Sequence, residues 1–159
     1  MPSPQARQRA LERGPGALGF LLAHHWPGQL DRCYRFWCRG RPVWLCARCA
    51  GLYPVLAAVL AGLLYWRPPT GWADWPWLFG LPLPALVDWG WSRWSGWTGR
   101  NWLRSLTGAM LGVGLARGLQ LHIISPGHRL ALAQFVFLGA VVLAVEIADR
   151  YRRRGGGAG

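Results

Sequence analysis

The sequence predicts an all-α integral membrane protein, a bundle of about four transmembrane helices preceded by a short N-terminal interfacial helix. Three observations support this prediction. Apolar residues make up 52% of the 159 residues, and 12 Trp and 22 Gly are unusual in a soluble domain of this length. Several apolar runs approach the roughly 20 residues that cross a bilayer. Arginines lie mainly between these runs.

The formal charge of +12 comes entirely from arginine, because all 18 basic residues are Arg. A nucleic-acid interface would place them along one amphipathic face. Here they occupy the segments between apolar runs, a pattern typical of side chains that meet the anionic surface of a bilayer. We therefore expect membrane lipids as partners and no nucleic acid.

Two spans are clear from composition. Leu130 to Ala148 contains ten Leu, Val and Phe residues, which favour insertion by about −3 to −6 kcal/mol. Ala50 to Trp66 is nearly as apolar and ends before Arg67-Pro68-Pro69, where proline cannot continue a helix. Both runs predict transmembrane helices.

Two further spans are interrupted. Trp102 to Leu121 contains Arg117, which must be paired or must snorkel to the interface, and its place near the end of the run favours snorkelling. Trp72 to Asp88 contains three prolines, so it is either a broken span or a re-entrant segment. Tryptophans flank it on both sides, as in interfacial belts.

Arginine-rich and arginine-poor loops alternate along the chain, and the positive-inside rule places the rich loops in the cytoplasm. We expect a multi-pass inner-membrane protein with both termini cytoplasmic and no signal peptide. Leu11 to Ala23 would form the interfacial helix. The expected divisions are a cytoplasmic or interfacial segment (1–23), a cytoplasmic His/Cys/Arg-rich segment (24–49), a four-helix membrane bundle (50–149) and a basic, Gly-rich disordered tail (150–159).

Four glycines of the third span form two pairs, each with four-residue spacing: Gly108 with Gly112, and Gly114 with Gly118. Small residues in this pattern let helix backbones come close together. They predict either packing within the chain's own bundle, which we favour, or a homo-oligomer interface.

All four cysteines lie just before the first span. Cys46 and Cys49 form a Cys-x-x-Cys pair, a spacing that lets two thiolates hold one tetrahedral zinc ion. His25 with Cys33 or Cys38 could complete the site, which would be structural if closed and catalytic in type if one position stays open. The same pair could instead be a redox dithiol, or ordinary interfacial thiols without a ligand.

Four other polar residues are expected at the same end of the bundle: Arg48, Asp88, Asn101 and Arg104. Ionisable groups at this depth are costly unless paired or functional. Asp88 could form a structural ion pair with Arg104 or take part in a site. The arginines also suggest an alternative function, binding or modifying anionic lipid headgroups.

The stretch from Cys46 to Tyr53, Cys-Ala-Arg-Cys-Ala-Gly-Leu-Tyr, resembles the signature of domain-of-unknown-function family 2085. The likeness includes His25 and Gly40-Arg41 before it, and it extends through Leu83 to Gly90 and a stretch from Asn101 to Gly108. The resemblance implies a small polytopic membrane protein of the bacterial and archaeal type, and it implies no activity.

Overall fold

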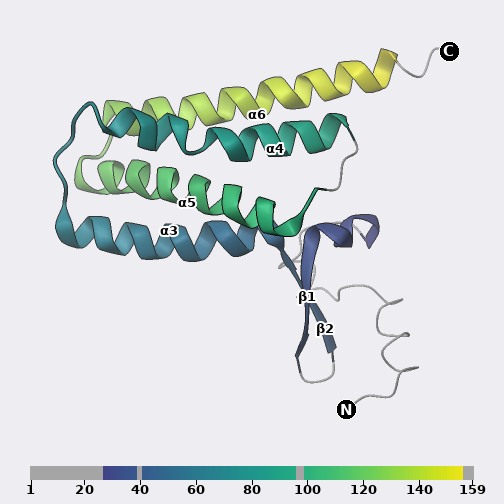
Figure 1. Cartoon of the computed structure of the whole chain (residues 1–159). Helices are drawn as coiled ribbons and strands as arrows, with labels where there is room; N and C mark the ends of the chain where they lie inside the picture. The colour runs from purple at the N-terminus through teal and green to yellow at the C-terminus, as the bar shows by residue number, and fades with distance from the viewer. Residues whose placement is uncertain (1–26, 39–40, 96–98, 156–159) are drawn as a thin grey trace.

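The computed structural model describes residues 27–38, 41–95 and 99–155, and four long helices lie side by side in it (Figure 1). Helices α3 and α5 run in one direction and α4 and α6 in the other. In chain order the elements are η1 (Pro27–Arg32), β1 (Cys33–Cys38), β2 (Arg41–Cys46), α3 (Ala47–Trp66), η2 (Pro76–Gly80), α4 (Leu83–Trp94), α5 (Asn101–Ile124) and α6 (Arg129–Gly155).

The prediction of an all-α fold is wrong in one place, because β1 and β2 form an antiparallel hairpin before the first long helix. The register pairs Cys33 with Cys46 and Cys38 with Arg41. Aromatic and β-branched residues, which favour strands, are frequent in both segments, and a glycine lies between them. Two-residue turns containing glycine are typical of hairpins, so the signal was present in the sequence.

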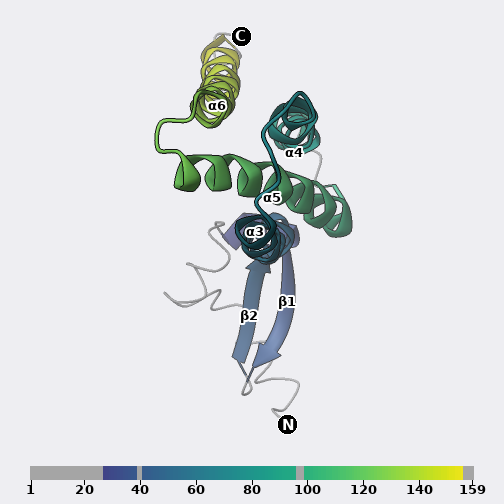
Figure 2. The same cartoon turned by 90° about the vertical axis from the view of Figure 1, so that its left-hand side faces the viewer.

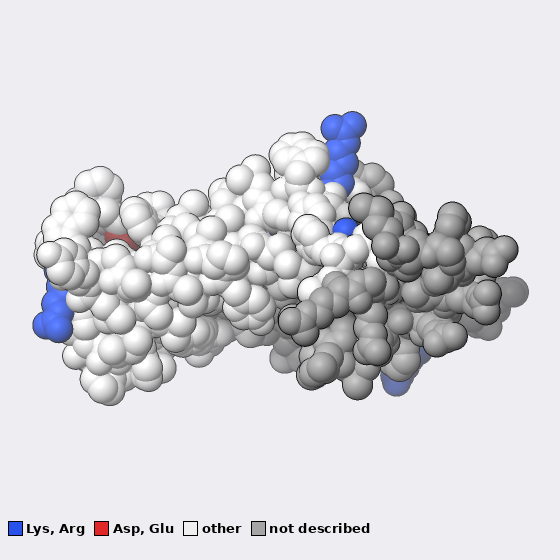
Figure 3. All heavy atoms as spheres, turned by 90° about the horizontal axis from the view of Figure 1, so that it is seen from below, with Lys and Arg blue, Asp and Glu red and all other residues white. Residues whose placement is uncertain are grey.

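In the part of the chain that the structure describes, two helices, α3 and α6, are long and apolar enough to cross a membrane, and they correspond to the two clear spans of the sequence; the other two predicted spans do not pass the same test. The apolar part of α3 is not buried inside the structure at all, and only 11% of that of α6 is. Figure 3 views the molecule from the α3 side, and the charged atoms visible there lie towards its ends. This surface is suited to lipid rather than to water.

Helix α5 occupies the centre of the bundle, between α3 on one side and α4 and α6 on the other (Figure 2). Its glycines make this possible. A Cβ on Gly108 or Gly112 would fall within 2.6 Å of a backbone oxygen of α3, and one on Gly114 or Gly118 would strike η2 or Gln134 of α6. All four therefore pack within the chain, the alternative we favoured, and a homo-oligomer through them stays only a prediction.

The expectation that Arg117 snorkels is wrong, because its side chain is buried and paired. The residue is 3% exposed, and its Nε donates to Asp74 at 2.7 Å. Its other nitrogens donate to the backbone oxygens of Pro68 and Pro69 at 3.2 and 3.1 Å and to the Gln120 side chain at 2.5 Å. The loop after α3 thus folds inward and supplies acceptors that the linear sequence did not reveal.

The segment from Trp72 to Asp88 is a broken helix that traverses the bundle (Figure 1). Its first piece is the π-helical turn η2, and α4 follows it and continues to Trp94. At the other end, α6 extends to Gly155, so the basic residues 150–154 are helical and not part of a disordered tail. The expected interfacial helix, Leu11 to Ala23, lies outside the described residues.

Candidate functional site

Three elements begin or end at one end of the bundle, where the hairpin joins α3 and where α5 starts. Two glycines hold α3 and α5 in backbone contact there. A Cβ on Gly51 would lie 1.9 Å from the Ser105 carbonyl oxygen, and one on Gly108 would lie 2.3 Å from that of Arg48. The first turns of both helices are therefore fixed against each other.

Arg48, in the first turn of α3, forms an ion pair with Asp88 of α4. The Asp88 side chain is 7% exposed, and Arg48 Nε is buried with no hydrogen-bond partner in residues 27–38, 41–95 and 99–155. The expected ion pair between Asp88 and Arg104 is therefore wrong, since the carboxylate is taken by the arginine of the Cys-Ala-Arg-Cys motif. Cys46 is the last residue of β2 and Cys49 lies in α3, so Arg48 stands just after the junction of strand and helix.

Arg104, one turn into α5, is 3% exposed, and none of its three guanidinium nitrogens has a hydrogen-bond partner in the part of the chain that the structure describes. Two acidic residues, Asp31 and Asp88, and two further arginines, Arg32 and Arg48, are near enough to act on it electrostatically. Among the described residues, three guanidinium groups and two carboxylates thus influence one another here, which leaves one positive charge in excess. A buried unpaired charge costs several kcal/mol, so this arrangement calls for an additional acceptor.

Asn101 begins α5 and ties the hairpin to it. Its Nδ2 donates to the backbone oxygens of Asp31 at 3.0 Å and Cys33 at 3.4 Å, and its buried Oδ1 has no partner among the residues that the structure describes. Ser105 donates to the Ala47 carbonyl at 2.8 Å and lies 2.9 Å from the Tyr34 hydroxyl. The four residues Arg48, Asp88, Asn101 and Arg104, which we call the Arg104 site, thus lie at one end of the bundle.

Three of the four cysteines meet beside this site. Cys33 and Cys46 are direct cross-strand partners, both buried, and a side-chain hydrogen bond joins Cys46 to Cys49. Cys38 lies at the outer end of β1, five residues and about 16 Å from Cys33 at the usual rise of a strand. The structure therefore forms a thiol cluster of Cys33, Cys46 and Cys49 and separates Cys38 from it. His25 lies outside the described residues.

The thiol cluster does not by itself form a ligand set for zinc. Within residues 27–38, 41–95 and 99–155, no group of three or more His, Cys, Asp or Glu side chains is placed to hold a metal ion. Burial, followed by the nearby Cys46 and Asp31, raises the pKa of the Cys33 thiol from 9.0 to about 11. Cys33 is therefore a neutral thiol at physiological pH in the absence of a ligand that displaces its proton.

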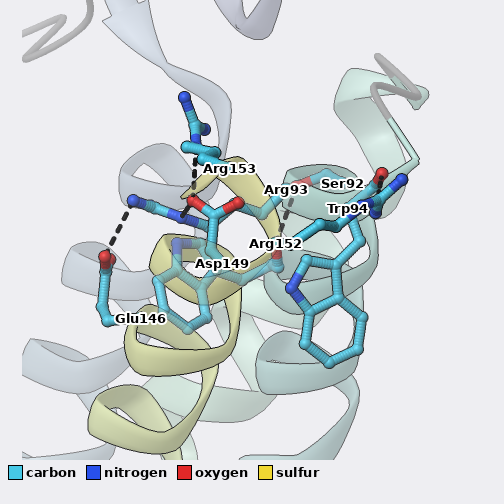
Figure 4. A network of polar contacts seen from close by, with 8 residues as sticks. Ser92, Arg93, Trp94, Glu146, Asp149, Arg152 and Arg153 are labelled. Carbon is cyan, nitrogen blue, oxygen red and sulfur yellow. Dashed lines mark hydrogen bonds and ion pairs between the residues drawn. The ribbon is translucent and has the colours of Figure 1, made fainter. Parts of the chain in front are cut away.

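A separate network at the same end joins α4 to α6 (Figure 4). Arg93 donates to Glu146 at 2.9 Å and to Asp149 at 3.1 Å, and its guanidinium lies 5.5 Å from the centre of the Trp89 ring. Arg153 adds a second bond to Asp149 at 3.1 Å. Every polar group drawn in this network has a partner, so we interpret the network as structural. We call the ion pairs of Arg93 with Glu146 and Asp149 the α4–α6 clamp.

Sequence reasoning missed Asp31, Tyr34 and Ser105 at the site. Ser105 follows Arg104 directly and lies four residues after Asn101, a spacing that puts Asn101 and Ser105 on one helix face. That spacing could have indicated Ser105. No local signal indicated Tyr34 or Asp31, because the hairpin had not been foreseen.

Comparison with known proteins gives one match. The model of the family described as "Predicted membrane protein (DUF2085)" matches residues 30–117, which is more than half of the chain. No curated protein and no solved structure matches significantly. The matched range includes the hairpin, the thiol cluster and the whole Arg104 site. The chain therefore belongs to the DUF2085 family of membrane proteins.

Proposed function

We propose that the protein binds a phosphate-bearing anion at the Arg104 site, with the headgroup of an anionic lipid as the ligand. The observation that carries the proposal is the buried guanidinium of Arg104, whose nitrogens have no partner among the described residues. A phosphate offers oxygens in the geometry that a guanidinium fork recognises, and it would balance the excess positive charge.

The surroundings support an anion rather than a cation. Within the described ranges Arg48 Nε is a further buried donor without a partner, and Asp88, one of the two carboxylates that act on Arg104, is already paired with Arg48. The site lies at the end of the bundle where α3, a candidate span, begins. Lipid phosphates are concentrated at this depth of a bilayer, so the proposed ligand and the site would lie at the same level.

Arginine distribution supports a cytoplasmic location for this end. Arg48, Arg93 and Arg104 lie there with the basic C-terminal end of α6, whereas Arg67 and Arg129 mark the opposite end. We accordingly propose the inner-membrane, multi-pass topology with both termini in the cytoplasm. Labelling of Cys38 by a membrane-impermeant reagent only after cells are opened is the expected result.

Native mass spectrometry of the full chain, purified in mild detergent, tests the ligand. Wild type is compared with Arg104→Gln and with Arg35→Gln, whose exposed arginine lies at the same end. We expect phosphate-bearing lipid to remain on wild type and Arg35→Gln at high ionic strength and to be lost from Arg104→Gln. Circular dichroism and gel filtration establish that each variant is folded.

A parallel measurement separates the two sources of phosphate. Thermal unfolding of delipidated protein is followed with and without inorganic phosphate. If inorganic phosphate raises the Tm of wild type but not of Arg104→Gln, while no lipid co-purifies, the ligand is free phosphate. Equal retention of lipid by Arg104→Gln and Arg35→Gln, with no Tm difference in phosphate, would refute a built anion site.

A second candidate is the zinc site, and the meeting of three thiols supports it. Zinc binding would require Cys33, Cys46 or Cys49 to lose protons and a further ligand, for which His25 is the candidate. Thiolates would also be acceptors for the Arg104 nitrogens. Elemental analysis of tag-free protein tests this, with Cys46→Ser/Cys49→Ser as the variant and Cys38→Ser as its matched control. Absence of stoichiometric metal from wild type would remove the hypothesis.

The third alternative, a membrane thiol oxidoreductase, rests on Cys46 and Cys49 alone. The raised pKa of Cys33 speaks against that thiol as the attacking nucleophile. Trapping of a mixed disulfide at Cys46 or Cys49 is the outcome that would favour this function over the other two.

A further inference from the structure

The hairpin of β1 and β2 has two faces of different composition. Side chains alternate between the faces of a strand, and the register pairs Tyr34 with Leu45 and Phe36 with Val43 on one of them. The rings of Tyr34 and Phe36 lie 6.4 Å apart on this face. We call these four residues the apolar hairpin face; the pair Cys38 and Arg41 follows them on the same side, at the outer end of the hairpin.

The opposite face is partly covered by the chain itself. Cys33 and Trp44 are buried on it, at 7% and 4% exposure, and pack with Leu30 of η1. Arg35 lies on this face as well and is exposed. By contrast, Phe36 on the apolar hairpin face is 54% exposed. The hairpin therefore exposes the Phe36 ring on the apolar hairpin face, whereas on the opposite face η1 packs on Cys33 and Trp44 and leaves Arg35 and Trp37 exposed.

The direction of the hairpin explains which surroundings this ring meets. Figures 1 and 2 both show the strands running across the axis of α3 and away from the other helices. With α3 as a membrane span, the hairpin extends along the bilayer surface. The Tyr34 hydroxyl contacts Ser105 of α5 at 2.9 Å, so the apolar hairpin face is turned towards the side on which the helices lie.

We propose that the hairpin lies flat on the bilayer at the end of the α3 span, with the apolar hairpin face in contact with lipid. Interfacial amphipathic elements bury their apolar side by about 5–10 Å, at the boundary between headgroups and acyl chains. Aromatic residues favour this depth. Segment 33–46 contains three arginines and no acidic residue, so it matches an anionic leaflet in charge. This inference does not depend on the Arg104 site.

An environment-sensitive fluorophore on a hairpin cysteine tests the orientation. Cys38 is exposed and shares the face of Phe36, whereas position 37 lies on the opposite face. Full-length protein labelled at Cys38 is compared with a Trp37→Cys/Cys38→Ser variant labelled at position 37, both in nanodiscs that contain phosphatidylglycerol. Mass spectrometry establishes the labelled residue.

We expect blue-shifted emission from the Cys38 label, quenching by lipids with a nitroxide near the headgroup, and loss of quenching by aqueous iodide. The label at position 37 should remain quenched by iodide. Equal iodide quenching at both positions without nitroxide quenching would overturn the proposal, because the hairpin would then project into water. Strongest quenching by nitroxides at the acyl-chain end would also overturn it, because the hairpin would then be inserted rather than flat.

Discussion

The ion pair between Arg117 and Asp74 allows a quantitative test of the fold, because both side chains are buried, at 3% and 9% exposure. Replacing Asp74 by Ala removes the countercharge but leaves Arg117 in place with its carbonyl acceptors. Breaking a buried pair in this way costs about 3–5 kcal/mol. We expect a loss of that size in the free energy of unfolding. The double variant Asp74→Leu/Arg117→Met places apolar residues at both positions. It should lower the free energy of unfolding by less than the sum of the losses from Asp74→Leu alone and Arg117→Met alone.

Reversible unfolding in mixed micelles, with circular dichroism as the readout, measures these differences. Arg129→Met is the matched control, since Arg129 is an exposed arginine at the same end of the bundle. It should change stability by no more than about 0.5 kcal/mol. A cost below about 1 kcal/mol for Asp74→Ala, or strict additivity of the two single changes, would refute the view that this pair holds the loop after α3 onto α5.

Three further predictions concern packing, the α4–α6 clamp and thiol chemistry. Gly51→Ala should lower the free energy of unfolding by about 1–3 kcal/mol, because the new Cβ would meet an α5 carbonyl oxygen at 1.9 Å. Gly62→Ala, where nothing lies within 4 Å of the new Cβ, should raise it by about 0.5–1 kcal/mol. Equal unfolding midpoints for the two variants would contradict this prediction. Arg93→Ala should lower the free energy of unfolding by about 1 kcal/mol. Arg153→Ala should lower it by less than half as much, because the Arg153 side chain is 72% exposed. The reverse order of Tm values would exclude a stabilising role of Arg93 between α4 and α6. Because the Cys33 pKa is raised from 9.0 to about 11, its alkylation at pH 8 should be about 100-fold slower than that of an unperturbed thiol. The folded state binds the Cys33 proton more tightly than the unfolded state does, so this contribution to the free energy of unfolding is present below pH 9 and is lost as pH rises to about 11. An alkylation rate that levels off near pH 9 would disprove the raised pKa.

Element identity was predictable where hydrophobicity alone decides it. The expected spans Ala50 to Trp66 and Leu130 to Ala148 correspond to α3 and α6 within a few residues at most ends. The prolines of the segment from Trp72 to Asp88 predicted a broken helix, and η2 followed by α4 is one. These features depend on the residues of the segment itself, because length, apolar content and proline act locally.

Partner choice was not predictable in the same way. Arg117 was expected to snorkel, yet the loop carrying Asp74 reaches it from more than 40 positions away in sequence. Asp88 was expected to pair with Arg104 but contacts Arg48. In each case several arginines and carboxylates compete at similar depth, and only the packing of helices around α5 decides which of them meet.

The sequence by itself determined that this chain is a helical membrane protein, where its two apolar spans lie, and that cysteines and arginines gather at one end. Those conclusions follow from local composition and from the burial preferences of single side chains. The tertiary structure alone decided that α5 is central, that Asp88 contacts Arg48, and that Arg104 is buried without a hydrogen-bond partner among the described residues. Such facts depend on helix contacts between distant residues, which no local pattern encodes.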